Sequence, residues 1–536
     1  MADAILDKNA CDNSTITSHD NIEYSPRAQL DSITKICKGD RLDLKYQYEI
    51  SCQALSEYAA KGLTPSKLKK IQRHIPIVYP WNDGYQLFRN NYNRRWSYFP
   101  IGIIKCRHAK DVKRAIDFVR EYKFEFSIRS GGHCSLAFSL SVSIIIDLSR
   151  MNKIKVVCNK ESKCRATKVR GNKFVVVGPG AILGKVIKKI SKYALSLPTG
   201  SCVNTGAGGL SCGGGISPSL VRLGGMTTDH LVSAKVLLAN GKVVNANEKE
   251  HADLFFAIRG AGGCNFGIIT EFTFHPCRFC GAIVFDIRYP WDLFSRVVEM
   301  WQNFAPFTCR RLSSELELFP PRFKAPENIL PIRIKGQFEG SEKIFYKLME
   351  PFVSLAKGKG SIIVKCVKTF AESGRFWGGT IQTYYQNASI FWYDKLSAQA
   401  IDTMATFLKN APHAGAFIAF NAMLGAVADV PSCATAFPHR KALFWNLIEG
   451  TTLNPQFLPQ QQIWVNRLYD ALIRFAKKVA GTTPGYVNAP QQNLQKDDKY
   501  LYAYYANNIY RLVNIKNKYD PKNFFRFEQS IPLNLY

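Results

Sequence analysis

Two short stretches of the chain combine nucleophilic side chains with glycine-rich backbone. The first is Arg129-Ser130-Gly131-Gly132-His133, and the second begins at Gly200-Ser201-Cys202. Imidazole and thiol groups can each form a covalent bond with an electrophilic partner. Glycines let the backbone approach a ligand closely, and the N–H groups of such turns bind phosphate oxygens. The two stretches therefore predict a site for a phosphate-bearing cofactor attached to the chain twice.

Further glycine clusters follow the second stretch and support this prediction. Each cluster alone is typical of a tight turn, but three clusters in strand-linked order with an imidazole and a thiol attached indicate a flavin site. The glycines are Gly206, Gly208, Gly209, Gly213, Gly214, Gly215, Gly260, Gly262, Gly263 and Gly267.

The elements that must position these residues follow an α/β pattern up to about residue 275. Short apolar runs predict strands, and apolar residues at a spacing of three and four predict amphipathic helices. The expected strands are 100–104, 124–128, 143–148, 173–177, 231–238, 242–245 and 266–274, and the expected helices are 112–122 and 183–190. The strand 124–128 leads directly into Arg129, so the sequence places the first glycine turn at a strand end.

Residues 281–487 show a different pattern of expected elements, in which strands alternate with longer helices. The clearest expected elements are strands at 281–287 and 328–336 and helices near 341–357 and 395–410. The stretch 500–532 predicts a helix and then an ordered tail.

Taken together, the chain resembles the vanillyl-alcohol-oxidase-type flavoproteins, specifically the berberine bridge enzyme-like branch. The similarity covers roughly residues 85–275 and resumes at 486–532. It is carried by the segments 92–96, 129–133, 146–152, 178–181, 200–215, 239–241, 257–267, 436–440, 507–521 and 528–532, together with Gly225 and Asp229.

The resemblance implies an α+β fold. A two-part FAD-binding domain of the PCMH type is expected with a substrate domain built on an antiparallel sheet covered by helices. The expected ranges are a polar tail at 1–35, an FAD-binding domain at 36–280 with its core at about 76–280, a substrate domain at 281–487, and a segment at 488–536 that returns to the FAD domain.

The resemblance also implies FAD bonded twice, through its 8α-methyl to His133 and through C6 to Cys202. The cofactor-binding positions that match the family are Arg129, Ser130, Gly131, Gly132, His133, Cys202, Thr205, Gly206, Gly208, Gly209, Asp229, Gly263, Gly267, Ile269 and Asn488. The small Thr205 stands where the family controls oxygen access, which favours dioxygen as the acceptor. The resemblance thus predicts a two-electron oxidation of a small alcohol, sugar or phenolic or alkaloid-like substrate.

The chain departs from the family where acid–base groups are expected. Tyrosines of the family are replaced by Ser135, Ile216 and Ala489, and the two inward positions of a substrate-domain strand match Asn446 and Ile448. These departures leave the catalytic base open and keep an alternative in view, a catalytically weak flavin-binding scaffold.

Three residues remain as candidates for the base. They are Tyr486, His439 and Glu449, the last of which would face inward if the alignment of its strand shifted by one residue.

Composition sets wider bounds. The chain has 536 residues, of which 46% are hydrophobic and 12% aromatic, and this content excludes global disorder. Its net charge of +30 admits an anionic partner such as a polyanion or nucleic acid.

Fifteen cysteines without regular spacing do not predict a disulfide framework, and the lone Cys277–Cys280 pair does not predict a metal site. No apolar run is long enough to span a membrane, and no secretory leader is expected. Compartment stays open, as does a homo-oligomer.

Overall fold

The computed structural model describes residues 41–158, 173–322, 330–378 and 381–535. The tail expected at 1–35 lies outside the described residues. The described residues 41–69 belong to one compact unit, which contains the helix α2 (Arg41–Ala60) and most of α3 (Pro65–Gln72). The second unit, from Lys70 to Tyr536, contains the site and is described below.

The first layer of the second unit is a four-stranded sheet in the order β1-β2-β4-β3. Its strands are β1 (Ile77–Val78), β2 (Gly102–Lys105), β4 (Ile144–Asp147) and β3 (Phe126–Arg129), and β2, β4 and β3 are parallel. Runs of isoleucine form β2 and β4 because parallel strands are buried on both faces. The helix α5 (Ala109–Glu121) crosses from β2 to β3 and buries the apolar stripe that the sequence predicts. Thus β3 ends at the first glycine turn.

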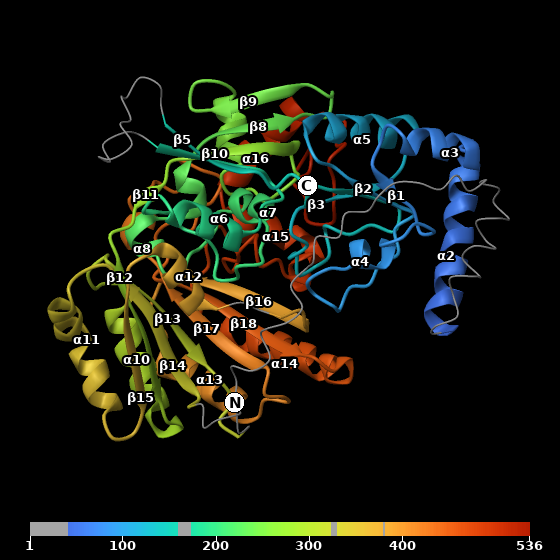
Figure 1. Cartoon of the computed structure of the whole chain (residues 1–536). Helices are drawn as coiled ribbons and strands as arrows, with labels where there is room; N and C mark the ends of the chain where they lie inside the picture. Colours follow the sequence, from blue (N-terminus) through green and yellow to red (C-terminus); the bar gives the residue numbers. More distant parts are fainter. Residues whose placement is uncertain (1–40, 159–172, 323–329, 379–380, 536) are drawn as a thin grey trace. The chain divides into compact units, whose positions relative to one another are not determined.

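The second layer is a five-stranded antiparallel sheet in the order β5-β6-β10-β8-β9. Its strands are β5 (Ile154–Cys158), β6 (Lys173–Val177), β10 (Ile268–Phe274), β8 (Leu231–Leu237) and β9 (Val243–Asn247). The helices that share its core are α6 (Leu183–Ser191), α7 (Ala207–Cys212), α9 (Ala252–Ala257), α15 (Lys499–Tyr505) and α16 (Asn508–Tyr519). The C-terminal segment therefore packs with the α/β part, although it follows the sheet below in sequence (Figure 1).

The third layer is a seven-stranded antiparallel sheet in the order β15-β12-β14-β13-β17-β18-β16. Its strands are β12 (Ala282–Tyr289), β13 (Leu312–Leu318), β14 (Ile332–Phe338), β15 (Ser361–Val367), β16 (Tyr384–Trp392), β17 (Ala416–Ala422) and β18 (Phe444–Thr452). Four helices cover one face: α10 (Phe294–Phe304), α11 (Glu342–Ala356), α13 (Ala398–Lys409) and α14 (Leu458–Leu472).

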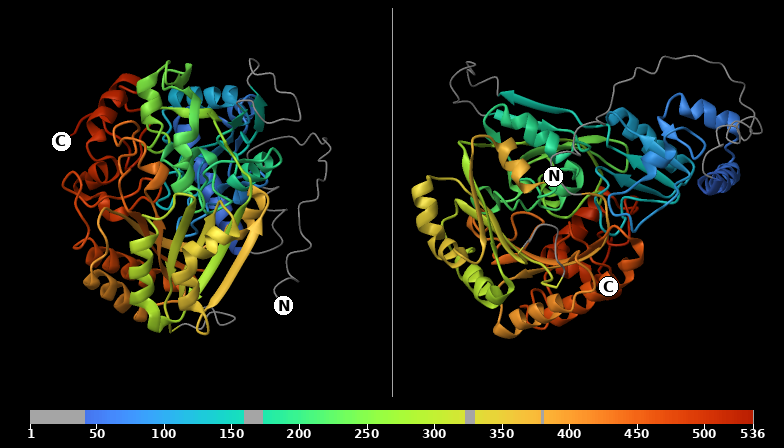
Figure 2. Two further views of the ribbon diagram at one scale, coloured as in Figure 1. Left: turned by 90° about the vertical axis from the view of Figure 1, so that its left-hand side faces the viewer. Right: turned by 60° about the horizontal axis from the view of Figure 1, so that its bottom comes forward.

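Alternation along the strands gives this large sheet two different faces. In β13, Leu312, Leu316 and Leu318 pack in the core with the helices, whereas Glu315 and Glu317 line a cavity on the opposite face. Figure 2 shows the helices on the outer side of this sheet and the α/β part on its inner side. The cavity lies against the inner face, which the four covering helices leave to the α/β part.

Short elements connect these layers. They are α4 (Tyr85–Arg89), β7 (Leu195–Ser196), α8 (Val221–Gly224), β11 (Cys277–Arg278) and α12 (Phe370–Trp377), with 3-10 turns at Thr227–His230, Trp291–Leu293, Gly425–Val427, Pro455–Phe457, Gln492–Leu494 and Lys496–Asp498. Within the described residues, none of the helices has both the length and the apolar character needed to cross a membrane.

Candidate active site

A cavity of about 790 Å³ separates the glycine turns from the seven-stranded sheet. Both predicted nucleophiles, His133 and Cys202, line it. The sheet contributes its inner face, including Glu449, Trp445 and Tyr385. This volume is in the range of small-molecule and cofactor sites.

The two glycine-rich stretches meet in direct backbone contact. A Cβ atom added to Gly131 would lie 2.4 Å from the amide nitrogen of Gly206, and a Cβ at Gly206 would lie 2.4 Å from the amide nitrogen of Gly131. Gly132 has a φ of 68°, in the left-handed region that favours glycine. Only glycine permits this approach, and the approach holds His133 and Cys202 on one cavity wall.

The imidazole of His133 is stacked on the ring of Tyr92, with 3.8 Å between the ring centroids. Burial lowers the pKa of His133 to about 4, while a hydrogen bond to the backbone of Asn204 partly opposes this shift. The ring is therefore neutral near pH 7, and one nitrogen retains the lone pair that a nucleophile needs.

Cys202 is half-buried at the start of the loop that leads into α7. Its carbonyl accepts a hydrogen bond from the N–H of Thr205, and the carbonyl of Thr205 accepts one from the N–H of Leu183. These bonds tie the loop to α6 and keep the thiol and the Thr205 side chain at the cavity.

The first turn also fits the phosphates of FAD. In the described part of the chain, the backbone N–H groups of Ser130, Gly131 and Gly132 donate to no protein acceptor, so they remain available to an anion. A Cβ at Gly209 would meet no atom within 4 Å, so bare backbone faces the cavity there. A run of free donors at a glycine turn is the arrangement by which proteins bind phosphate oxygens. The residues present thus fit the cofactor.

Most of the predicted cofactor positions lie on this cavity. They are Ser130, Gly131, Gly132, His133, Cys202, Thr205, Gly206, Gly208, Gly209, Gly263, Ile269 and Asn488. Asn488 donates through Nδ2 to the carbonyl of Leu210 and to the hydroxyl of Tyr486, at 3.0 and 3.1 Å.

Three predicted cofactor residues, Arg129, Asp229 and Gly267, lie outside the lining of this cavity. The guanidinium of Arg129 is bound to Asp147 and to the carbonyls of Phe88 and Asn90, so it supports the turn from behind. Gly267 packs against β8, where a Cβ would lie 2.7 Å from the carbonyl oxygen of Leu237.

Asp229 is the third such residue. Its two carboxylate oxygens accept hydrogen bonds from the guanidinium of Arg440, each at 2.8 Å. The pair joins the turn before β8 to the loop before β18, so the carboxylate holds two parts of the chain together instead of facing the cofactor space.

The inner face of β18 carries a carboxyl group. The side chains of Trp445, Leu447 and Glu449 line the cavity, whereas Ile448 is buried against the helices and the Nδ2 of Asn446 donates to the carbonyl of Ala419. Asn446 and Ile448 therefore do not face inward, and the alternative that the sequence left open, an alignment shifted by one residue with Glu449 facing inward, is the one seen in β18.

Glu449 has no hydrogen-bond or ion-pair partner among the described residues. Burial raises its pKa to about 7. Burial raises the pKa of Tyr385, and the nearby carboxyl of Glu449 raises it further, with smaller contributions from Cys134, Tyr92 and Cys202. Glu449 thus shares one region of the cavity with Tyr385 and Cys202.

The other two candidates for the base are less suitable. The hydroxyl of Tyr486 lines the cavity and accepts hydrogen bonds from the N–H of Gly215 and from Asn488, but burial raises its pKa to about 12. His439 lies outside the lining, with one ring nitrogen bonded to Tyr393 and the other to the carbonyl of Ala503. Neither accepts a proton readily from a substrate in this cavity.

The three positions at which tyrosines of the family are replaced also reach the cavity. Ser135, Ile216 and Ala489 all line it, so their small or apolar side chains shape the site directly.

Sequence reasoning missed Glu315 and Lys335, which face the same cavity from β13 and β14. The alternation of leucine with glutamate in 312–318 is the signal that could have identified the first.

Comparisons with known proteins identify the family. Residues 100–247 match the family model of an FAD binding domain, and residues 485–532 match the model "Berberine and berberine like". The chain is 34% identical over 466 residues to the FAD-linked oxidoreductase YgaK of Bacillus subtilis (strain 168), covering 85% of this chain and 96% of that protein. It is 25% identical over 514 residues to a chitooligosaccharide oxidase of Gibberella zeae, covering 90% and 98%.

Solved structures show the same fold. The BBE-like 1 protein of Physcomitrella patens superposes with a TM-score of 0.77 at 22% identity, covering 88% of this chain and all of that one. A chitooligosaccharide oxidase superposes with a TM-score of 0.75 at 23% identity, covering 87% and 98%. The turn, the cavity and the sequence matches lead to one conclusion: the chain belongs to the berberine bridge enzyme-like family of FAD-linked oxidoreductases.

Proposed function

We propose that this enzyme oxidises a hydroxyl-bearing carbon of a carbohydrate, with dioxygen as the final electron acceptor and Glu449 as the base. The observation that carries the proposal is the unpartnered carboxyl of Glu449, with a pKa of about 7, in the cavity that contains His133 and Cys202. A general base is most effective when its pKa lies near the working pH.

The chain's own residues divide the remaining tasks. The carboxylate of Glu449 accepts the proton of the substrate hydroxyl at Oε, while His133 and Cys202 hold the cofactor covalently. When bound, FAD supplies the two-electron acceptor. The substrate leaves as a carbonyl compound, and dioxygen takes two electrons and two protons to become hydrogen peroxide. The side chain of Thr205 is small enough to leave a path for dioxygen.

The cavity wall supports a carbohydrate in preference to a purely apolar alcohol. Trp445, Phe417 and Tyr385 offer aromatic surface, and Asn387 and Thr451 offer hydrogen-bonding groups from the same sheet face. A relative that is 25% identical to this chain bears the name chitooligosaccharide oxidase. A sugar presents both an apolar ring face and hydroxyl groups, so it complements a wall of this composition.

The attachment of the cofactor is tested by mass and colour. We expect intact mass to show one FAD per chain, and the yellow colour to remain with acid-precipitated protein. Either single variant, His133→Ala or Cys202→Ala, should retain covalent FAD through the other residue, and the double variant should release all colour into the supernatant. Unmodified polypeptide mass in the native protein would exclude covalent attachment.

The base is tested with Glu449→Gln, which keeps the shape of the side chain but removes its proton-accepting oxygen. Peroxide release from cello- and chito-oligosaccharides should fall by about 10²–10⁴-fold, the usual contribution of a positioned base. In the native enzyme, kcat should rise with pH through an apparent pKa near 7, because only the carboxylate accepts a proton.

The matched control is Glu299→Gln, at an exposed position on α10, which should leave rate and pH profile unchanged. Full activity in Glu449→Gln would reject this assignment. A lack of peroxide from every sugar tested, with covalent FAD present, would reject the carbohydrate oxidase.

A further inference from the structure

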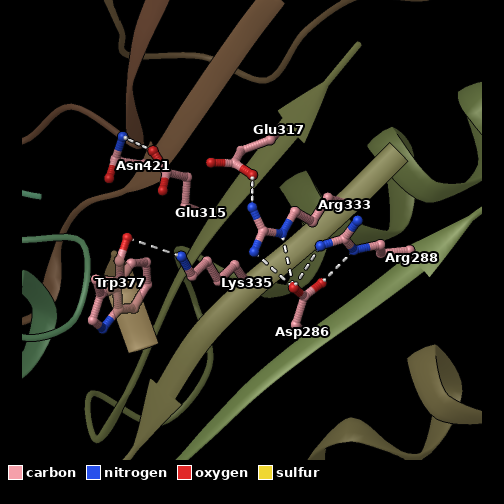
Figure 3. A network of polar contacts seen from close by, with 8 residues as sticks. All are labelled: Asp286, Arg288, Glu315, Glu317, Arg333, Lys335, Trp377 and Asn421. Atoms are coloured by element: carbon pink, nitrogen blue, oxygen red, sulfur yellow. Dashed lines mark hydrogen bonds and ion pairs between the residues drawn. The ribbon is translucent and has the colours of Figure 1, made fainter. Parts of the chain in front are cut away.

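The inner face of the large sheet carries a row of charged residues beyond Glu449. Arg288 and Arg333 both donate to the carboxylate of Asp286, and Arg333 also donates to Glu317 at 2.9 Å (Figure 3). Both guanidinium groups are therefore neutralised by carboxylates. This half of the network is complete without a ligand.

The neighbouring pair on the same two strands has a different arrangement. Glu317 and Arg333 are direct partners across β13 and β14, and so are Glu315 and Lys335. Opposite charges at such positions are close enough to pair, and the first two do so. Glu315 and Lys335 form no ion pair with one another or with any other described residue.

Each member of the open pair turns to a different neutral group. One carboxylate oxygen of Glu315 accepts a hydrogen bond from Nδ2 of Asn421 at 3.2 Å, and the ammonium of Lys335 donates to the carbonyl of Trp377 at 3.2 Å. The rings of Phe376 and Trp377 lie 5.1 and 4.9 Å from this ammonium. Figure 3 shows the two side chains diverging on the same sheet face.

Lys335 is buried to all but 6% of its surface and lines the cavity. A buried cation without a carboxylate partner costs free energy that an incoming anion can offset. Two of its three N–H donors have no acceptor among the described residues. The position thus offers a charge and two donors to a ligand.

The neighbouring carboxyl does not oppose an anion at neutral pH. Burial, together with the charge of Glu317, raises the pKa of Glu315 to about 8, whereas Lys335 and Arg333 act in the other direction. A protonated Glu315 donates a hydrogen bond and carries no charge. With Glu315 neutral, the cations of this network exceed its anions.

We infer that Lys335 and Glu315 form a subsite for a carboxylate group of the substrate, at a point distant from the carbon that is oxidised. The inference rests on the proposed function and narrows it to acidic oligosaccharides, such as those that end in a uronic acid. The ligand's carboxylate accepts hydrogen bonds from the ammonium of Lys335 and from the carboxyl of Glu315.

The register of the sheet gives the distance of this subsite from the base. Lys335, Glu315, Asn421 and Trp445 are successive cross-strand partners over β14, β13, β17 and β18. Three strand spacings separate Lys335 from Trp445, or about 14 Å, and Glu449 lies four residues further along β18. The acidic group therefore belongs to a sugar unit other than the one that reacts, which excludes a monosaccharide.

The test measures binding to the FAD-loaded enzyme by calorimetry with two probes. One is methyl β-cellotrioside, and the other is the same trisaccharide with glucuronate at its non-reducing end. The methyl group blocks the anomeric carbon, so binding is measured without turnover there. We expect the acid to bind at least about tenfold more tightly, as one charge-assisted contact predicts.

The diagnostic variant is Lys335→Met, which has similar volume and no charge. Its dissociation constant for the acid should rise by at least about 30-fold, as loss of a buried charged partner predicts, while that for the neutral probe changes by less than about threefold. Glu315→Gln should keep the affinity for the acid, because it resembles the protonated carboxyl. Lys335→Gln repeats the test if Lys335→Met does not accumulate as folded, flavin-loaded protein.

The control is Lys343→Met, an exposed position on α11 with the same change in charge, and it should bind both probes as the native enzyme does. Equal affinity for the two probes, no binding of either, or equal losses in Lys335→Met and Lys343→Met would overturn the subsite. Peroxide release from neutral cellotriose is scored separately. Release without acid preference rejects the subsite alone, and acid-selective binding without any peroxide from free sugars rejects the oxidase alone.

Discussion

The environment of Glu449 suits the proposed role of a base at the expense of the fold. A carboxyl that is enclosed in the cavity and has no partner among the described residues resists ionisation, which places its pKa near the value a base requires. The same burial destabilises the folded chain once the group is ionised. Activity and stability therefore respond in opposite directions to this residue.

The free energy of unfolding should depend on pH through the ionisation of Glu449. The folded pKa of Glu449 is raised from 4.5 to about 7, so the folded chain binds more protons than the unfolded chain between these values. The free energy of unfolding contributed by this group is highest below pH 4.5 and falls as pH rises to 7. Glu449→Gln should match the native enzyme near pH 4.5 and be more stable than it at pH 8.

Urea midpoints at the two pH values measure this difference, and Glu299→Gln serves as the control. A shift of equal size at both pH values would show that packing, not ionisation, distinguishes the variant.

At the scale of elements, the contact between the two glycine turns determines whether the site forms. Gly131→Ala places a Cβ 2.4 Å from the backbone nitrogen of Gly206, and backbone atoms have little room to move. Overpacking of this kind costs about 1–3 kcal/mol. We expect a lower thermal midpoint and less FAD per purified chain.

Gly374→Ala is the matched substitution, because this glycine lies within α12 and its added Cβ would first meet a side-chain methyl group of Ile187 at 3.2 Å. The free energy of unfolding of Gly374→Ala should stay within about 1 kcal/mol of the native value. Equal losses in both variants would show that the contact between the turns has no special role.

Local patterns predicted many elements correctly. The strands β2, β3 and β6 and the helices α5 and α6 lie where apolar runs and helical spacing place them. The strand β14 begins at Ile332, later than the expected 328. Local patterns do not encode which strands become neighbours, so the register that opposes Glu315 to Lys335 became visible only in the sheet.

In the site as well, features that depend on neighbouring residues were predictable, and features that depend on the sheet were not. The glycines, His133 and Cys202 are close in sequence to the turns they form, so most of the predicted cofactor positions lie on one cavity, and their contact with FAD stays a prediction. The sequence does not show that the side chains of Arg129 and Asp229 bind Asp147 and Arg440, because a charged residue beside a glycine turn can equally hold protein segments together. The facing of Glu449 depended on strand pleat, where a shift of one residue reverses every side chain.

At the scale of the whole molecule, the net charge of +30 should guide acidic substrates to the cavity. Salt screens such long-range attraction. We expect kcat/KM for the glucuronate-ended trisaccharide to fall by about threefold or more between low and physiological ionic strength. The neutral trisaccharide should change little, and an equal salt effect on both would contradict steering by charge.

Other consequences of the charge stay predictions. A polyanion partner rests on composition alone, a homo-oligomer stays open, and the division into domains at 281 and 488 rests on the resemblance to the family. Family membership adds the fold and the cofactor over most of the chain, since 85% of it aligns with YgaK.

The two faces of the seven-stranded sheet have different tasks, so the fold and the substrate preference can evolve independently. Residues at one parity of each strand build the core with the helices, and residues at the other parity form the cavity wall. Descendants of one ancestor can therefore exchange wall residues such as Glu315, Lys335 and Trp445 with little disturbance to the core. Divergence among enzymes of this architecture is expected to concentrate at alternate positions of the same few strands.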